Sequence, residues 1–163
     1  MGIYKDLEYE FVERTLNLIS QYESILHKFE FKEQYNYTLL INCLTGLIIM
    51  PKERTITAIP NDRLLSGMKK DMGLEHTVIN AKFGTLRDFI IALRHCAAHF
   101  AIEVKSDHDG VSIGEIVFYD DRNGPRYEVA IFKATELLPF VRYYADWLKS
   151  NLKTAERNRV VKK

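Results

Sequence analysis

The chain has 163 residues, of which 47% are hydrophobic and 28% charged, and its formal net charge is +1 at pH 7. This length fits a single domain, and the near-neutral charge excludes a uniformly basic nucleic-acid-binding surface, so any RNA contact must come from a local patch. The longest apolar run, Leu44 to Met50, is too short to cross a bilayer, and the N-terminal residues lack the apolar core of a signal peptide. We therefore expect a cytoplasmic protein without a membrane partner, in which Cys43 and Cys96 are buried thiols.

The first fifty residues predict two helices. Apolar residues recur at steps of three and four from Tyr4 to Phe29, which places them on one stripe of a helix. The same spacing returns from Tyr37 to Ile48, where further apolar side chains indicate a helix that is enclosed on more than one side. Pro51 is expected to end this second helix.

Residues 51–83 form the least regular part of the chain. A connection of this length inside a compact domain is typically functional or mobile. Asn61 and Asp62 are candidates to cap a short helix that starts at Arg63. The segment also supplies cations that are candidates to contact an RNA backbone, namely Lys52, Arg54 and Lys82.

The sequence from residue 85 onward first predicts a third helix and then a change to β structure. Thr85 begins the helix, and Asp88 three residues later completes a weak capping box. Beyond Phe100, β-prone runs flank Asn123-Gly124, a pair that strongly indicates a hairpin. The alternation of inward-facing residues slips by one place at Gly114, which predicts a bulge there.

A last helix is expected from about Thr135 to Leu152, with Pro139 tolerated because it falls in the first turn. The predicted fold is therefore mainly α, a bundle of four main helices with a β-hairpin inserted between the third and the fourth. Residues 1–155 are expected to form this single domain, and residues 156–163 a basic C-terminal tail.

The third helix carries the chemically most informative stretch, Leu93 to Phe100. It contains Arg94, a permanent cation suited to phosphate, and His95 and His99, which can exchange protons near neutral pH. These residue types together indicate phosphodiester chemistry that needs no metal or other cofactor.

A helical projection separates these side chains. Arg94 and His99 lie about 140° apart around the helix axis, whereas His95 and His99, four residues apart, share a face. Ile91 and Ala98 lie between Arg94 and His99, in a sector where a merely solvated face would not favour isoleucine. We interpret this sector as the face of a homodimer, on which charged groups converge on a shared cleft.

The stretch Arg94-His95-Cys96-Ala97-Ala98-His99 resembles the signature of HEPN domains. In that signature an arginine, often followed by a polar residue, precedes a histidine by a spacer of four to six residues. The position of the stretch, on the helix before the last, is also similar. The segment from Asn36 to Glu53 further resembles a bacterial, often plasmid-borne HEPN subfamily. HEPN domains are helical and usually dimeric, and many are metal-independent ribonucleases.

The resemblance implies an endoribonuclease, with a toxin or phage-defence role, that leaves 2′,3′-cyclic phosphate and 5′-hydroxyl ends. His99 would exchange a proton with the ribose 2′-hydroxyl or the leaving 5′-oxygen, Arg94 would hold the scissile phosphate, and His95 would orient these groups or share the proton transfer. Arg87, seven residues before Arg94, would add an RNA contact. Some toxin members carry a tyrosine two residues after the histidine, which an antitoxin modifies. Here that residue is Ala101, which leaves any antitoxin or defence partner open.

The same residues admit other interpretations. His95 and His99 have the spacing of a zinc-binding pair, but no third ligand is evident in the sequence. Cys96 could be a nucleophile beside His99, although small buried thiols are far commoner. Arg94 and His99 could instead belong to a non-catalytic HEPN-like scaffold or lie on the solvated face of a plain helix. A separate alternative is a non-catalytic dimeric module that binds RNA or a protein partner. A further alternative is an accessory protein that contacts other proteins through its long loop and hairpin.

Overall fold

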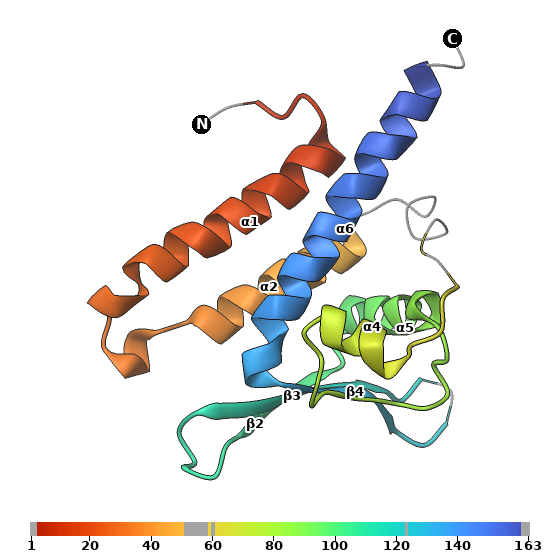
Figure 1. The fold of residues 1–163 in the computed structure, drawn as a ribbon. Coiled ribbons are helices and arrows are strands. Elements are labelled where there is room, and N and C mark those ends of the chain that lie inside the picture. The colour runs from red at the N-terminus through yellow and green to blue at the C-terminus, as the bar shows by residue number, and fades with distance from the viewer. Residues whose placement is uncertain (1–2, 51–58, 60, 123, 161–163) are drawn as a thin grey trace.

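The computed structural model describes residues 3–50, 59, 61–122 and 124–160, with residues 153–160 described by their backbone alone (Figure 1). Helices dominate these residues, so the fold is mainly α, as predicted. The helices are α1 (Leu7–Ile25), α2 (Asn36–Ile49), α4 (Ser66–Asp71), α5 (Leu86–Ala98) and α6 (Ala134–Val160), with short 3₁₀ turns η1 (Leu26–Lys28) and η2 (Phe31–Glu33). The strands are β1 (Val78–Ile79), β2 (Ile102–Ser106), β3 (Ile113–Asp120) and β4 (Tyr127–Lys133).

The two N-terminal helices form where the apolar spacing predicts them. The carboxylate of Asp6 caps α1 by accepting a hydrogen bond from the Tyr9 backbone N–H, and the helix buries Val12 and Ile19, seven residues apart. Helix α2 buries side chains over a wider arc because it packs against α1, α5 and α6. The central position of α2 places its C-terminal end beside α5.

The inserted β structure is larger than the predicted hairpin. Strands β3 and β4 pair antiparallel, and two further strands extend them into an antiparallel sheet of order β1-β4-β3-β2. The prediction of a bundle with a single hairpin was therefore wrong. Strand β2 directly follows α5 and pairs with β3, and β1 comes from the segment that we expected to be irregular.

The bulge predicted at Gly114 is confirmed. The partner of Lys105 is Glu115, whereas the partner of Ser106 is Ile113, so Gly114 is the extra residue of β3. A Cβ atom at position 114 would lie only 3.0 Å from the Cα of Asp107. Glycine has no Cβ atom and therefore avoids this close contact. A larger residue at this position would therefore require the backbone at Asp107 to shift.

Two helix boundaries differ from the prediction. Asn61 and Asp62 cap no helix at Arg63, which instead bridges to Thr85, and the short helix α4 begins at Ser66. Helix α6 begins directly after β4 and continues to Val160, beyond the predicted end at Leu152. Pro139 is thus its sixth residue and lies past the first turn.

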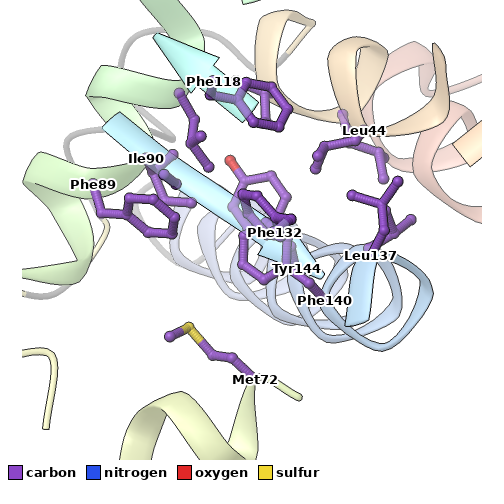
Figure 2. Close-up of a cluster of buried hydrophobic side chains, with 14 of the residues drawn as sticks. Leu44, Met72, Phe89, Ile90, Phe118, Phe132, Leu137, Phe140 and Tyr144 are labelled. Atoms are coloured by element: carbon purple, nitrogen blue, oxygen red, sulfur yellow. The ribbon is translucent and has the colours of Figure 1, made fainter. Parts of the chain in front are cut away.

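The core lies between the helices and one face of the sheet. Figure 2 shows aromatic side chains from α5, β3, β4 and α6 gathered at its centre. Phe132 of β4 lies 5.3 Å from Phe140 and 5.4 Å from Phe118, measured between ring centroids. Helices α5 and α6 both lie over the sheet in Figure 1, and both contact β3 and β4. This packing fixes the orientation of α5, on which the predicted functional residues lie.

Candidate functional site

The two histidines of the motif lie on the exposed side of the C-terminal end of α5. The Thr85 hydroxyl caps the helix by accepting a hydrogen bond from the Asp88 backbone N–H, which confirms the predicted start. The helix buries the following side chains: Leu86, Phe89, Ile90, Leu93, Cys96 and Ala97. Asp88, His95, Ala98 and His99 are exposed on the remaining surface. The two histidines are therefore accessible to a ligand from solvent.

Arg94 leaves this surface and turns toward α2. Its Nη1 donates hydrogen bonds to the carbonyl oxygens of Ile48 and Ile49, at 2.9 and 3.0 Å. Carbonyls at a helix C-terminus lack partners within the helix and carry partial negative charge, so a guanidinium is well suited to them. Arg94 thus caps α2 and ties it to α5.

Arg87 makes a similar contact one helical repeat earlier. The side chain is half-buried, and its Nε donates to the carbonyl oxygen of Ile59 at 2.7 Å. Arg87 and Arg94 therefore hold the chain on the two sides of residues 50–58. The candidate RNA contacts Lys52 and Arg54 lie in this connection, outside the described residues.

His99 occupies the C-terminal end of α5. The backbone N–H of Ala101 donates to the Cys96 carbonyl and that of Phe100 to the Ala97 carbonyl, a pair of bonds known as the Schellman motif. The motif requires a left-handed residue after the cap, and Phe100 takes this conformation with φ of 52°. Phe100 is 74% exposed, so the core does not hold its side chain in place.

His95 lies near charged groups that the sheet supplies. Burial lowers the pKa of the His95 imidazole, and the nearby charges of Arg122, His99 and Arg94 lower it further, while Asp120 acts in the opposite direction. The neutral imidazole is therefore favoured relative to an isolated histidine. A neutral imidazole is the form that accepts a proton.

Asp120 and Arg122 form a rigid ion pair at the end of β3. Arg122 donates from Nε to Oδ1 of Asp120 at 2.9 Å and from Nη2 to Oδ2 at 2.8 Å. The Tyr127 hydroxyl donates to the same carboxylate at 3.1 Å. Hydrogen bonds to the ionised form, led by those from Arg122, hold the pKa of Asp120 well below its usual range. Arg122 is therefore a fixed cation near His95.

Asp120, Arg122 and Tyr127 were not predicted as site residues from the sequence. They became site residues because Ile102 pairs with Phe118, which brings the end of β3 back beside the C-terminal end of α5. The Asn-Gly signal predicted a turn after β3 but not which helix the turn approaches. The pairing of β2 with β3 determines this, because β2 directly follows α5.

A groove next to His95 contains another predicted residue, Lys82. The groove has a volume of about 390 Å³ between α5 and the segments that carry Lys82, Phe83 and Tyr127. The Lys82 ammonium nitrogen lies 3.2 Å from the centroid of the Tyr127 ring, within the range of a cation–π contact. The structure therefore brings Lys82 and His95 to one groove, while Arg87 and Arg94 bond to backbone carbonyls and do not line that groove.

Cys96 lies on the buried side of α5. Burial raises the pKa of its thiol to about 11, and that of Cys43 likewise, so both remain protonated at neutral pH. Both are free and buried, as predicted, and a protonated thiol is a poor nucleophile. Within the described part of the chain, no three His, Cys, Asp or Glu side chains gather as a metal-binding group.

Comparison with known proteins identifies the family. A family model described as HEPN pEK499 p136 matches residues 1–154, nearly the whole chain. No curated protein and no solved structure is significantly similar to the chain. In the described residues, no helix combines the length and apolar character needed to span a bilayer. The extent of the family match shows that the chain belongs to the HEPN pEK499 p136 family.

Proposed function

We propose that this HEPN protein is a metal-independent endoribonuclease with a toxin or defence role. One observation carries the proposal: His95 and His99, two exposed histidines four residues apart at the C-terminal end of α5, share a face, and the fixed cation Arg122 lies near His95. Two proton-transfer groups beside a cation are what cleavage of a phosphodiester next to a 2′-hydroxyl requires. Family membership supports the same reaction class.

In the proposed reaction, one histidine accepts the proton of the ribose 2′-hydroxyl while the 2′-oxygen attacks phosphorus. The bond from phosphorus to the 5′-oxygen breaks, and the second histidine, in its protonated form, donates a proton to that oxygen. The products are a 2′,3′-cyclic phosphate and a 5′-hydroxyl. The lowered pKa of His95 fits it to accept a proton at neutral pH, which leaves His99 to exchange the second proton. Arg94 is assigned to the scissile phosphate on family resemblance.

We further propose that two copies of α5 form one composite cleft in a homodimer. The exposed surface around Ala98 lies between Arg94 and His99, and the small side chain lets a second helix approach closely. Arg94 and His99 diverge around the axis of one helix, so groups from two subunits are needed to converge on one phosphate.

The test is cleavage of single-stranded RNA in the presence of EDTA. Wild-type protein is expected to cleave with cyclic-phosphate ends, and His99→Ala and His95→Ala to lose about 10²- to 10⁴-fold in rate. His27→Ala is the matched control, because His27 is exposed on η1, outside the motif, and should keep full activity. Undiminished cleavage by His99→Ala, or no cleavage by wild type, contradicts the proposal.

A second candidate function is a non-catalytic module that binds RNA. The observation that favours it is the contact of Arg94 with the two α2 carbonyls, which assigns this guanidinium a structural task. This alternative predicts salt-sensitive RNA binding with no product, even at long incubation. The cleavage assay above therefore separates the two functions.

A further inference from the structure

We propose that the groove beside His95 binds the base of an unpaired nucleotide and so places the adjoining phosphate at the motif histidines. The groove has a volume of about 390 Å³ and opens to solvent, and this volume lies within the range of small-ligand sites, about 300–1,000 Å³. The inference deepens the proposed ribonuclease function and rests on it. It identifies a binding site for the base, the part of the substrate that the motif residues do not contact.

The walls of the groove suit a flat aromatic ligand. Phe83 is half-buried and packs against the core, so its ring is held in place, and the half-buried Tyr127 is anchored by the bond from its hydroxyl to Asp120. Ile91 of α5 supplies an apolar surface in the same groove. Nucleic acid bases stack on aromatic side chains without needing a particular sequence, because every base has a π-face.

In the proposed complex, the base takes the position that the Lys82 ammonium occupies over the Tyr127 ring, and the ammonium moves to the phosphate. The Lys82 ammonium lies over the Tyr127 ring, 3.2 Å from the centroid, and 5.2 Å from that of Phe83. The side chain is exposed, so it has room to leave the ring face when a base arrives. The displaced ammonium then reaches the phosphate of the same nucleotide, which compensates for the lost cation–π contact.

The charges around the groove decide which part of the nucleotide enters. Asp88 lines it as an exposed carboxylate, which repels a phosphate from its interior but accepts hydrogen bonds from base N–H groups, whereas the carboxylate of Asp120 is paired with Arg122. Lys82 and His95 line the groove, and Arg122, the ion-pair partner of the lining residue Asp120, lies near His95. The uncharged base therefore occupies the groove and the phosphate stays at the edge, next to His95.

The experiment uses a fluorescein-labelled, single-stranded 2′-O-methyl RNA decamer, which cannot form the cyclic product. Its binding is followed by anisotropy at several salt concentrations. Lys82→Gln is expected to weaken binding and to reduce the slope of log affinity against log salt by about 0.7, the value for one phosphate contact on a single strand. Lys28→Gln is the matched control, because Lys28 is exposed on η1, a different element.

The aromatic wall is tested with two substitutions of Phe83. Phe83→Leu keeps most of the packing volume and is expected to weaken decamer binding about tenfold, whereas Phe83→Tyr keeps the ring and the affinity. A fully paired duplex of the same sequence should bind less tightly than the single strand, because its bases are not available for stacking. Backbone amide signals of Lys82 and Tyr127 should shift on addition of the decamer.

The outcomes distinguish this inference from the proposed function. Equal affinity of wild type, Lys82→Gln and Phe83→Leu, or equal binding of duplex and single strand, overturns the groove assignment even if wild type cleaves RNA. Binding that depends on Lys82 and Phe83, with no cleavage of unmodified RNA, supports the groove and rejects the ribonuclease. Thermal melting of each variant confirms that it is folded, and Phe83→Tyr keeps the test valid if Phe83→Leu does not fold.

Discussion

Phe100 combines an exposed aromatic ring with a backbone conformation that usually belongs to glycine. Its φ of 52° closes the Schellman motif at the end of α5, directly after His99. A bulky residue in this region is strained by about 1–3 kcal/mol. Because the ring is exposed, the folded chain gains no core contact in return.

Phe100→Gly is therefore expected to stabilise the protein. Relief of strain, less the greater flexibility of glycine when unfolded, leaves a gain of about 1 kcal/mol and a melting temperature higher by about 2–4 °C. Phe100→Ala is the matched control, because it removes the ring but keeps a Cβ atom and hence the strain. A lower melting temperature for Phe100→Gly than for Phe100→Ala would contradict this explanation.

The charge of Arg122 provides a test of the environment of His95. Replacing it in Arg122→Gln removes a cation that lowers the pKa of His95 and leaves Asp120, which raises that pKa, without its ion-pair partner. The pKa of His95 should rise, as measured by NMR titration of its imidazole Cε1–H signal. If His95 accepts a proton in the reaction, the acidic limb of the pH–rate profile moves to higher pH with it.

Arg142→Gln is the control for this titration, since Arg142 pairs with Glu23 between α6 and α1. It should leave the His95 signal unchanged. A His95 pKa that falls or stays constant in Arg122→Gln would show that Arg122 does not act on the imidazole.

At the scale of elements, the end of α2 depends on a side chain from α5. The Arg94 guanidinium bonds two terminal carbonyls that lie 45 and 46 residues earlier in the chain. This contact joins α2 and α5, and the packing of these two helices determines where the motif residues lie. A loss of activity on changing Arg94 therefore has two sources, which must be separated by measuring stability.

Arg94→Ala is expected to lower the free energy of unfolding by about 1.5–3 kcal/mol, the usual contribution of a hydrogen bond to a charged group. Arg94→Lys should lose less, because it keeps a cation at the helix terminus. Urea unfolding measures both, with Arg142→Ala as a control whose exposed ion pair should contribute about 1 kcal/mol or less. Equal losses for Arg94→Ala and Arg142→Ala would exclude the capping role.

Local sequence predicted the elements better than it predicted their partners. The cap at Thr85 and the bulge at Gly114 were foreseen because both depend on residues within a few positions of each other. Strand β2 was missed because it is short and is stabilised by its pairing with β3. The end of α6 was placed too early because its last turns lack an apolar stripe.

At the scale of the whole molecule, the proposed site depends on assembly. We expect wild type to be a dimer by light scattering, with twice the 19.0 kDa mass of one chain. Ala98→Arg should shift it to monomer and abolish cleavage, because a long cation replaces a small side chain where the helices meet. Ala81→Arg, also exposed but outside α5, should stay dimeric and active. A monomeric wild type that cleaves RNA would rule out the composite cleft.

The sequence by itself determined the motif helix, its buried stripe and its cap, because helical periodicity and capping act over three to seven residues. It also carried the family resemblance that the match over residues 1–154 supports. The tertiary structure alone decided that Arg94 points to α2 and Arg87 to Ile59, contacts that span 45 and 28 residues. It likewise decided that Arg122 lies near His95 and that Lys82 and His95 line the same groove. Partners at such separations are set by how helices and strands pack, and no local pattern along the chain encodes that packing.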